Sequence, residues 1–337
     1  MAKQRNSRRS RNVQKPTTRK AAFESLESRC LLTATASFDS GVLTIEAPGT
    51  EQNAVTVSIH SGFVKVTDGA TTLIGVADAI DPQSVSIIYV DLAGGADSLN
   101  LNGVVPGPVA FPADVDIYAY MGDGNDSVQA SPYDDSVYAG ANDDILWGMD
   151  GDDELNGEGG SDTVSGMDGN DIISGGDDPD SLLGGQNNDT LFGEGGNDTM
   201  EGNEHEDFMT GGTGNDSMWG GEGNDEMEGS EDDDTLDGYS GDDTIRGGGI
   251  FTDDAGEDSI YGGDGTYNDE LWGGGGSDTI RGGGGNDKVF AKAPFDNNDG
   301  AVDWLFGDAG DDSLFGDSTN DSDVANGGTG TDFFDID

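Results

Sequence analysis

The chain has 337 residues, of which 69 are Asp or Glu and 14 are Lys or Arg, giving a formal net charge of −55. Glycine supplies 58 residues and only 32% of the chain is hydrophobic, which is little for an ordinary globular core of this length. Because so acidic a body repels other polyanions, the composition excludes nucleic acid and anionic lipid as its partners and favours cations. The single cysteine, Cys30, excludes an internal disulfide, and no stretch approaches the roughly 18 apolar residues of a membrane span.

Residues 1–36 differ from the rest of the chain because they are basic. Eight of the 14 Lys and Arg lie within residues 1–20, and the run AAFESLESRCLLTATAS follows. Its Phe, Glu, Leu, Arg and Ala spacing resembles the N-terminal motif of large exported planctomycete proteins, roughly F-E-x-L-E-x-R-x-L-L-x-A. The resemblance implies export, and so a secreted, extracellular or cell-surface protein. The alternative is a disordered basic tail.

Residues 37–116 have the texture of β-strands. Segments such as GVLTIEA, AVTVSI, GFVKVT and SVSIIYVDL are rich in Val, Ile and Thr and are bounded by Gly, Asp and Pro. We predict a β-rich N-terminal cap that leads into the region that follows. The alternative is a small separate β-sandwich with a ligand of its own.

Residues 117–337 repeat with a period of nine. An Asp recurs at one phase without a slip from Asp126 to Asp243, and the pattern returns after insertions from Asp258 to Asp332. An apolar residue stands two positions after each of these Asp residues, as Val128 follows Asp126. We therefore predict that each three-residue segment centred on the apolar residue is a short strand with one inward side chain.

Glycine recurs with the same period, from Gly148 to Gly247. Because glycine reaches positive φ without strain and leaves room beside the backbone, we predict that these residues mark turns where the backbone approaches an ion. The copies MGDGNDSVQ, GGTGNDSMW and GGGGNDKVF match G-G-x-G-x-D-x-U-x, and this signature resembles the haemolysin-type (RTX) calcium-binding nonapeptide.

The resemblance implies an all-β fold, a right-handed parallel β-roll with two nonapeptides in each turn and about eleven turns. It also implies multiple Ca²⁺ ions, each bound by turn carbonyls and Asp carboxylates between one turn and the turn 18 residues on. The implied ligands are Asp126, Asp135, Asp144, Asp153, Asp162, Asp171, Asp180, Asp189, Asp198, Asp216, Asp225, Asp234, Asp243, Asp258, Asp278, Asp287, Asp312 and Asp332.

Four units have neither glycine nor Asn or Asp at the fourth position of the repeat, and carry instead Tyr133, His205, Tyr267 and Ala301. We expect these side chains to distort the turn, so that those units hold calcium weakly or not at all. For this reason Asp207, in the His205 unit, is left out of the implied ligands.

Outward aromatic residues precede many of the turns. By the alternation of units, Tyr138, Phe192, Trp272, Phe290 and Phe315 fall on one face, and Trp147, Trp219, Tyr261 and Phe306 on the other. This division favours packing beside the turns over a single stripe for a partner.

The sequence offers no catalytic constellation. His205-Glu206 begins like a zinc-protease H-E-x-x-H but ends at Met209, and no nucleophile motif or phosphate-binding loop is present. We therefore predict a non-enzymatic calcium-binding protein with a structural, adhesive or cell-surface role. The alternatives are a glycan- or protein-binding module in residues 37–116 on a calcium-stiffened stalk, and an accessory domain of an enzyme.

Overall fold

The computed structural model describes residues 34–39, 42–47, 49, 52–60, 63–68, 71–74, 80–104, 115–248, 256–263, 265–292, 301–316 and 323–336. Most of the basic segment 1–36, including its export-like motif up to residue 33, lies outside the described residues. The described part is all-β apart from one 3-10 turn, η2 (Pro82–Ser84). Across these ranges the structure contains no helix that is long and apolar enough to cross a membrane.

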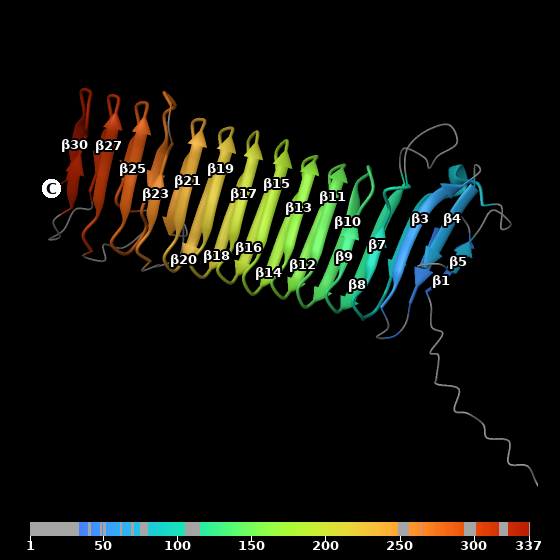
Figure 1. Ribbon diagram of the computed structural model, residues 1–337. Helices are drawn as coiled ribbons and strands as arrows, with labels where there is room; N and C mark the ends of the chain where they lie inside the picture. The colour runs from blue at the N-terminus through green and yellow to red at the C-terminus, as the bar shows by residue number, and fades with distance from the viewer. Residues whose placement is uncertain are drawn as a thin grey trace, which may run out of the picture. The chain divides into compact units, whose positions relative to one another are not determined.

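The strands form two sheets of fifteen strands each (Figure 1). In order, the first sheet contains β1 (Thr35–Asp39), β2 (Val42–Glu46), β6 (Ile87–Asp91), β8 (Asp116–Asp123), β10 (Asp135–Ala141), β12 (Glu154–Gly159), β14 (Ile172–Asp177), β16 (Thr190–Gly195), β18 (Phe208–Thr213), β20 (Glu226–Glu231), β22 (Thr244–Gly248), β24 (Glu270–Trp272), β26 (Lys288–Phe290), β28 (Ser313–Phe315) and β30 (Phe333–Asp335). The second sheet contains β5 (Thr71–Ile74), β4 (Phe63–Asp68), β3 (Ala54–His60), β7 (Ser98–Asn100), β9 (Ser127–Gln129), β11 (Ile145–Asp150), β13 (Thr163–Asp168), β15 (Ser181–Gln186), β17 (Thr199–Glu204), β19 (Ser217–Glu222), β21 (Thr235–Ser240), β23 (Ser259–Tyr261), β25 (Thr279–Gly284), β27 (Trp304–Ala309) and β29 (Val324–Asn326).

Successive repeats alternate between the two sheets, and each strand pairs in parallel with the strand one full turn away. Val137 of β10 lies opposite Leu155 of β12, and Leu146 of β11 lies opposite Val164 of β13, so the register in the regular region is 18 residues. Two nonapeptides therefore complete one rung. The parallel solenoid of about eleven turns that the repeat predicted is confirmed.

The first strands of both sheets come from residues 34–104. β2 and β6 pair in parallel and lead to β8 in the first sheet, while β3 and β7 pair in parallel and lead to β9 in the second. β1 adds to β2 in the antiparallel direction, and β4 and β5 extend the second sheet in the same way beyond β3. Each sheet thus begins with antiparallel strands and continues with parallel ones.

The core is a narrow column between the two sheets. From Val128 to Leu314 the apolar residue of every repeat in the described ranges is buried, and these side chains join the N-terminal strands in one continuous cluster. In the last rung this burial fails, because Phe334 is 45% exposed. In the described residues no further strand covers β30, so its inward side lacks the neighbour that buries the other rungs.

The strands are longer than the sequence indicated. Most strands between β11 and β21 have six residues rather than three, and the typical burial pattern, as in β18, has two inward positions. The first inward residue is the apolar one and the second is the periodic glycine, such as Gly211. The glycine run from Gly148 to Gly247 therefore lies inside strands and not in turns, which corrects the prediction.

The outward aromatic residues divide between the sheets as predicted, and they stack along the direction in which the rungs are added. Tyr120 and Tyr138 stack with ring centroids 5.1 Å apart, and near the C-terminus Phe290 stacks on Trp272 at 5.4 Å and on Phe315 at 4.7 Å. Such contacts join neighbouring rungs outside the narrow core.

Candidate metal centres

The repeat Asp residues form two rows, one along each edge where the chain turns from one sheet to the other. The Asp126 row precedes the strands of the second sheet: Asp97, Asp126, Asp144, Asp162, Asp180, Asp198, Asp216, Asp234, Asp258, Asp278, Asp303 and Asp323. The Asp135 row precedes the strands of the first sheet: Asp135, Asp153, Asp171, Asp189, Asp207, Asp225, Asp243, Asp269, Asp287, Asp312 and Asp332. All the implied ligands therefore stand in these two rows.

Except in Asp135, one oxygen of the carboxylate accepts a hydrogen bond from the rung before it. The backbone N–H of Asp153 donates to Oδ1 of Asp171 at 2.8 Å, and the N–H of Asp171 donates to Oδ1 of Asp189 at 2.8 Å. The backbone carbonyl of the same Asp accepts a hydrogen bond from the next rung. In Asp153, for example, it accepts from the Ile172 N–H at 2.8 Å. Each such carboxylate is thus fixed between two consecutive rungs.

The second oxygen has no hydrogen-bond donor although it is buried. This holds for Oδ2 of Asp126, Asp144, Asp153, Asp162, Asp171, Asp180, Asp189, Asp198, Asp207, Asp216, Asp225, Asp243, Asp287 and Asp312, and for Oδ1 of Asp135. The ion pairs seen within the described ranges involve Glu226, Asp308 and Glu270, none of which is a repeat Asp. A buried ionised oxygen without a donor or counter-charge is costly, so the rows require a cation or a proton.

Backbone carbonyls converge on the same places. A Cβ built on Gly148 would overlap Oδ2 of Asp153 and would lie 2.7 Å from the carbonyl oxygen of Gly166, one rung on. The same holds at Gly157, where the added atom would overlap Oδ2 of Asp162. Two acceptor oxygens thus face one small space that only glycine leaves open. This space, rather than positive φ, explains the periodic glycine, because neither Gly148 nor Gly157 has a left-handed φ.

Left-handed backbone occurs on either side of the turn instead. The second repeat position has positive φ, as at Met149 (91°), and so does the fourth, as at Gly151 (126°). In the regular units the fourth position is therefore taken by a residue that tolerates positive φ, such as glycine or Asn. These two reversals turn the chain between the sheets and present its carbonyls along the edge.

The donor set suits a hard divalent cation. Within the described residues, no group of three or more His, Cys, Asp or Glu side chains is placed to hold a metal ion. A metal at the rows would therefore take most of its ligands from backbone carbonyls and one or two carboxylate oxygens. Ca²⁺ accepts six to eight oxygen ligands of this kind in flexible geometry, whereas Zn²⁺ favours His and Cys.

Burial also changes the acidity of the rows. Desolvation, with a smaller contribution from the neighbouring carboxylates, raises the pKa of Asp153 to about 9. Burial likewise raises the pKa values of Asp189 and Asp243 to about 8, against the lowering effect of their backbone hydrogen bonds. Without a cation these carboxyl groups are therefore drawn toward the neutral form at neutral pH.

The distortion predicted at His205 is absent. His205 has φ of 84°, which matches the 82° of Asn142 at the same repeat position. Asp207 accepts from Asp189 N–H at 2.8 Å and donates its own N–H to Asp225 at 2.9 Å, as the regular units do. Asp207, which sequence reasoning set aside, therefore has the geometry of the other row members.

The Tyr133 unit does differ. Its first position is Ala130 rather than glycine, and Oδ2 of Asp135 accepts from the Ser131 backbone N–H at 2.8 Å and from the Ser131 hydroxyl at 3.0 Å. The oxygen without a donor is then Oδ1. Asp135 thus keeps one unsatisfied oxygen in a rotated arrangement.

Sequence reasoning missed the start of the Asp126 row. Asp97 donates its N–H to Oδ1 of Asp126 at 2.5 Å and accepts from the backbone N–H and side-chain Nδ2 of Asn53 at 2.5 and 3.0 Å. The sequence Gly94-Gly95-Ala96-Asp97-Ser98-Leu99 carries the signal. The spacing from Asp97 to Asp126 is 29 residues instead of 18, which hides it from a count in nines.

A family model for the RTX calcium-binding nonapeptide repeat (four copies) matches residues 120–155, 147–182, 183–218, 219–249, 250–266, 265–293 and 299–334, together more than half of the chain. Comparison with curated proteins gives no match. The matched segments cover both rows of Asp from Asp126 onward. The chain therefore belongs to the RTX calcium-binding nonapeptide repeat family, whose repeats bind calcium ions at multiple sites.

Proposed function

We propose that each Ca²⁺ lies at a turn edge between consecutive members of one Asp row. Its ligands are the carboxylate oxygens that lack a donor and the backbone carbonyls of the adjoining turns. The buried second oxygen of the repeat Asp residues carries this proposal, because a cation supplies what the hydrogen-bond network leaves unmet. We include Asp207 among the ligands on the same ground, and Asp97 because its backbone N–H donates to Oδ1 of Asp126 as the other row members do to their neighbours.

Calcium in these positions has a structural role. Each ion cancels two negative charges and joins one rung to the next, so its binding free energy contributes to folding. The narrow core supplies little to oppose the repulsion of a chain with a net charge of −55. Calcium is then the component that completes the solenoid.

We also propose that the protein works outside the cell, in a structural, adhesive or cell-surface role. Extracellular calcium modules bind with Kd on the order of 10⁻⁴–10⁻³ M, a range that external calcium reaches. The resemblance of residues 1–36 to an export motif supports this location. We further propose that residues 37–116 form the N-terminal cap and that residues 117–337 form the calcium-binding roll. The continuous parallel pairing of β2, β6 and β8 supports the assignment of the cap.

Counting bound calcium tests the ligand assignment. Equilibrium dialysis of the full chain, with metal analysis of the protein compartment, should give about one ion for each neighbouring pair in the two rows. Mg²⁺ should compete poorly, because it demands near-octahedral geometry and gives up its water reluctantly. A chain that binds only one or two ions, or that binds Mg²⁺ equally well, would contradict the proposal.

A further inference from the structure

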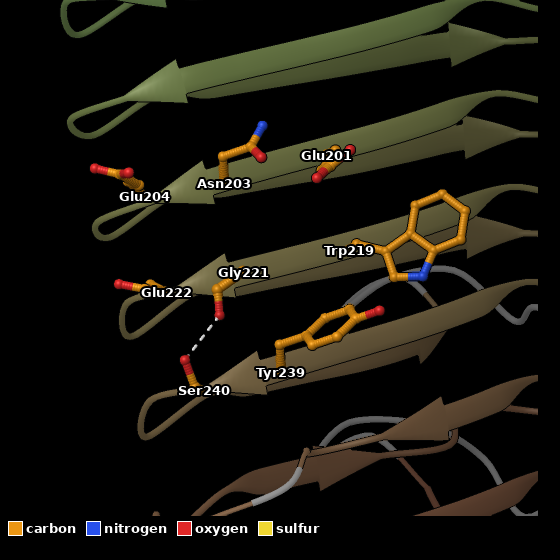
Figure 2. Close-up of a pocket in the computed structure, with 8 residues that line it drawn as sticks. All are labelled: Glu201, Asn203, Glu204, Trp219, Gly221, Glu222, Tyr239 and Ser240. Carbon is orange, nitrogen blue, oxygen red and sulfur yellow. Dashed lines mark hydrogen bonds between the residues drawn. The ribbon is translucent and has the colours of Figure 1, made fainter.

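An open groove lies on the outer face of the second sheet. It has a volume of about 730 Å³ and crosses β17, β19 and β21 (Figure 2). Its hollow follows from register: Gly221 lies between Asn203 and Tyr239 on the neighbouring strands, so one side chain is missing from that column. Figure 2 shows the rings of Trp219 and Tyr239 beside this gap.

The groove combines aromatic rings with negative charge. Glu201, Glu204 and Glu222 line it together with Trp219 and Tyr239, and the described lining residues include no Lys or Arg. Tyr239 is 52% exposed, so its ring is open to a ligand. Aromatic faces and carboxylates both attract a cation.

Each of the two sheets has one site on its strands where an arginine of the chain contacts both an aromatic ring and a carboxylate. The Arg246 guanidinium lies 4.9 Å from the ring centroid of Trp272 and forms an ion pair of 2.9 Å with Glu226. The Arg281 guanidinium lies 5.2 Å from the ring of Phe306 and binds Asp308 at 2.9 and 3.0 Å.

Both arginines occupy the same place relative to their rings. Arg246 is the register partner of Trp272, and Arg281 is the register partner of Phe306, in each case one rung before the aromatic residue. The register partner of Trp219 one rung before it is Glu201. At the groove an acid thus stands where the other two sites have their cation.

We propose that this groove binds an arginine side chain of a basic peptide or protein. The guanidinium would lie against Trp219 and Tyr239 and pair with the carboxylates of Glu201 and Glu222, as Arg246 and Arg281 do within the chain. Guanidinium suits the site because it is planar, stacks on aromatic rings and binds carboxylates with directed hydrogen bonds. The groove lies within residues 199–240, and not in residues 37–116, where the alternative drawn from sequence placed a glycan- or protein-binding module.

The test uses the full calcium-loaded chain and the peptide acetyl-Gly-Arg-Gly-amide, with binding followed by NMR of the indole N–H signals and by calorimetry. The Trp219→Leu variant removes the ring, and Glu201→Arg places an internal guanidinium in the groove. Trp147→Leu is the matched control for the first variant, because Trp147 holds the equivalent position on the same sheet with Gln129 and Ser165 as register partners. Glu231→Arg is the matched control for the second, because it makes the same charge change at an exposed site of the first sheet.

We expect the peptide to shift the Trp219 signal, Trp219→Leu to weaken binding about five- to thirtyfold, and Glu201→Arg to abolish it. The two controls should bind as the unaltered chain does. A peptide with citrulline in place of arginine should not bind, and a lysine peptide should bind less tightly. The proposal is overturned if citrulline binds equally, if a neutral sugar alone shifts the Trp219 signal, if the controls lose as much affinity as the groove variants, or if no binding occurs.

Discussion

At the scale of single residues, the repeat Asp explains why the periodic residue is glycine. The Asp side chain turns its second oxygen into the space that a Cβ of the glycine five residues earlier would fill. The glycine is therefore set by contact with the carboxylate, while the residues that take left-handed φ stand at the second and fourth repeat positions.

Gly157→Ala should be destabilising and should weaken calcium binding at Asp162. The added methyl group overlaps Oδ2 of Asp162 and lies 2.6 Å from the carbonyl oxygen of Gly175, so the backbone must shift, at a cost of about 1–3 kcal/mol. Gly159→Ala is the matched control in the same strand, since its methyl group meets only the Gly140 oxygen at 4.0 Å. Thermal unfolding at saturating calcium compares the two. Equal stability of the two variants would show that the space beside Asp162 is not restricted.

Two variants, Asp216→Asn and Asp207→Asn, should each lose one bound calcium ion. Asparagine keeps the oxygen that accepts from the preceding rung but replaces the unsatisfied oxygen with an NH₂ group, which repels a cation and faces a carbonyl. In chelator both variants should therefore be no less stable than the unaltered chain. Calorimetric counting of calcium decides the matter. If only Asp216→Asn loses an ion, the expectation drawn from sequence would hold, namely that the unit with His205 does not bind calcium.

At the scale of elements, the two Asp rows make the calcium-free solenoid sensitive to pH. Burial raises the pKa of the row carboxyls from their ordinary value of 3.8 to about 6 in Asp171 and to about 9 in Asp153. A raised pKa means that the folded state binds more protons than the unfolded state, so stability is present below about pH 4 and is lost as pH rises through these folded values.

In metal-free protein the β signal in circular dichroism should therefore be present at mildly acidic pH and decline as pH rises between about 6 and 9. Saturating calcium should remove this decline, because the cation then replaces the proton at the unsatisfied oxygen. A metal-free β signal that stays constant, or that grows with rising pH, would contradict the assignment of these oxygens.

The sequence predicted the element order of the repeats but not their lengths. The nine-residue phase of Asp and of apolar residues such as Leu146 sufficed for parallel strands 18 residues apart, and the structure confirms them. Strand length was missed because glycine is a poor indicator of strands, and only the three-dimensional contact of Gly148 with Asp153 explains its place inside one. Asp97 was not identified as a row member, because its pairing with Asp126 spans 29 residues instead of 18.

At the scale of the whole molecule, the repulsion between acidic residues opposes folding, whereas the burial of the apolar core favours it. From residue 121 onward the chain carries 57 acidic and four basic residues. Its core is a single column of apolar side chains between two sheets, with one such side chain from each repeat. Because each rung contacts mainly its neighbours, folding and unfolding should spread along the stack once the charge is neutralised.

The central claim is that calcium makes this solenoid fold, and a calcium titration of the metal-free full chain at about pH 8 tests it most directly. We expect a cooperative rise of β signal and a fall in hydrodynamic radius at free calcium on the order of 10⁻⁴–10⁻³ M, with Mg²⁺ much less effective. A chain that is already compact and β-rich in chelator at this pH, and that changes neither property when calcium is added, would contradict the account.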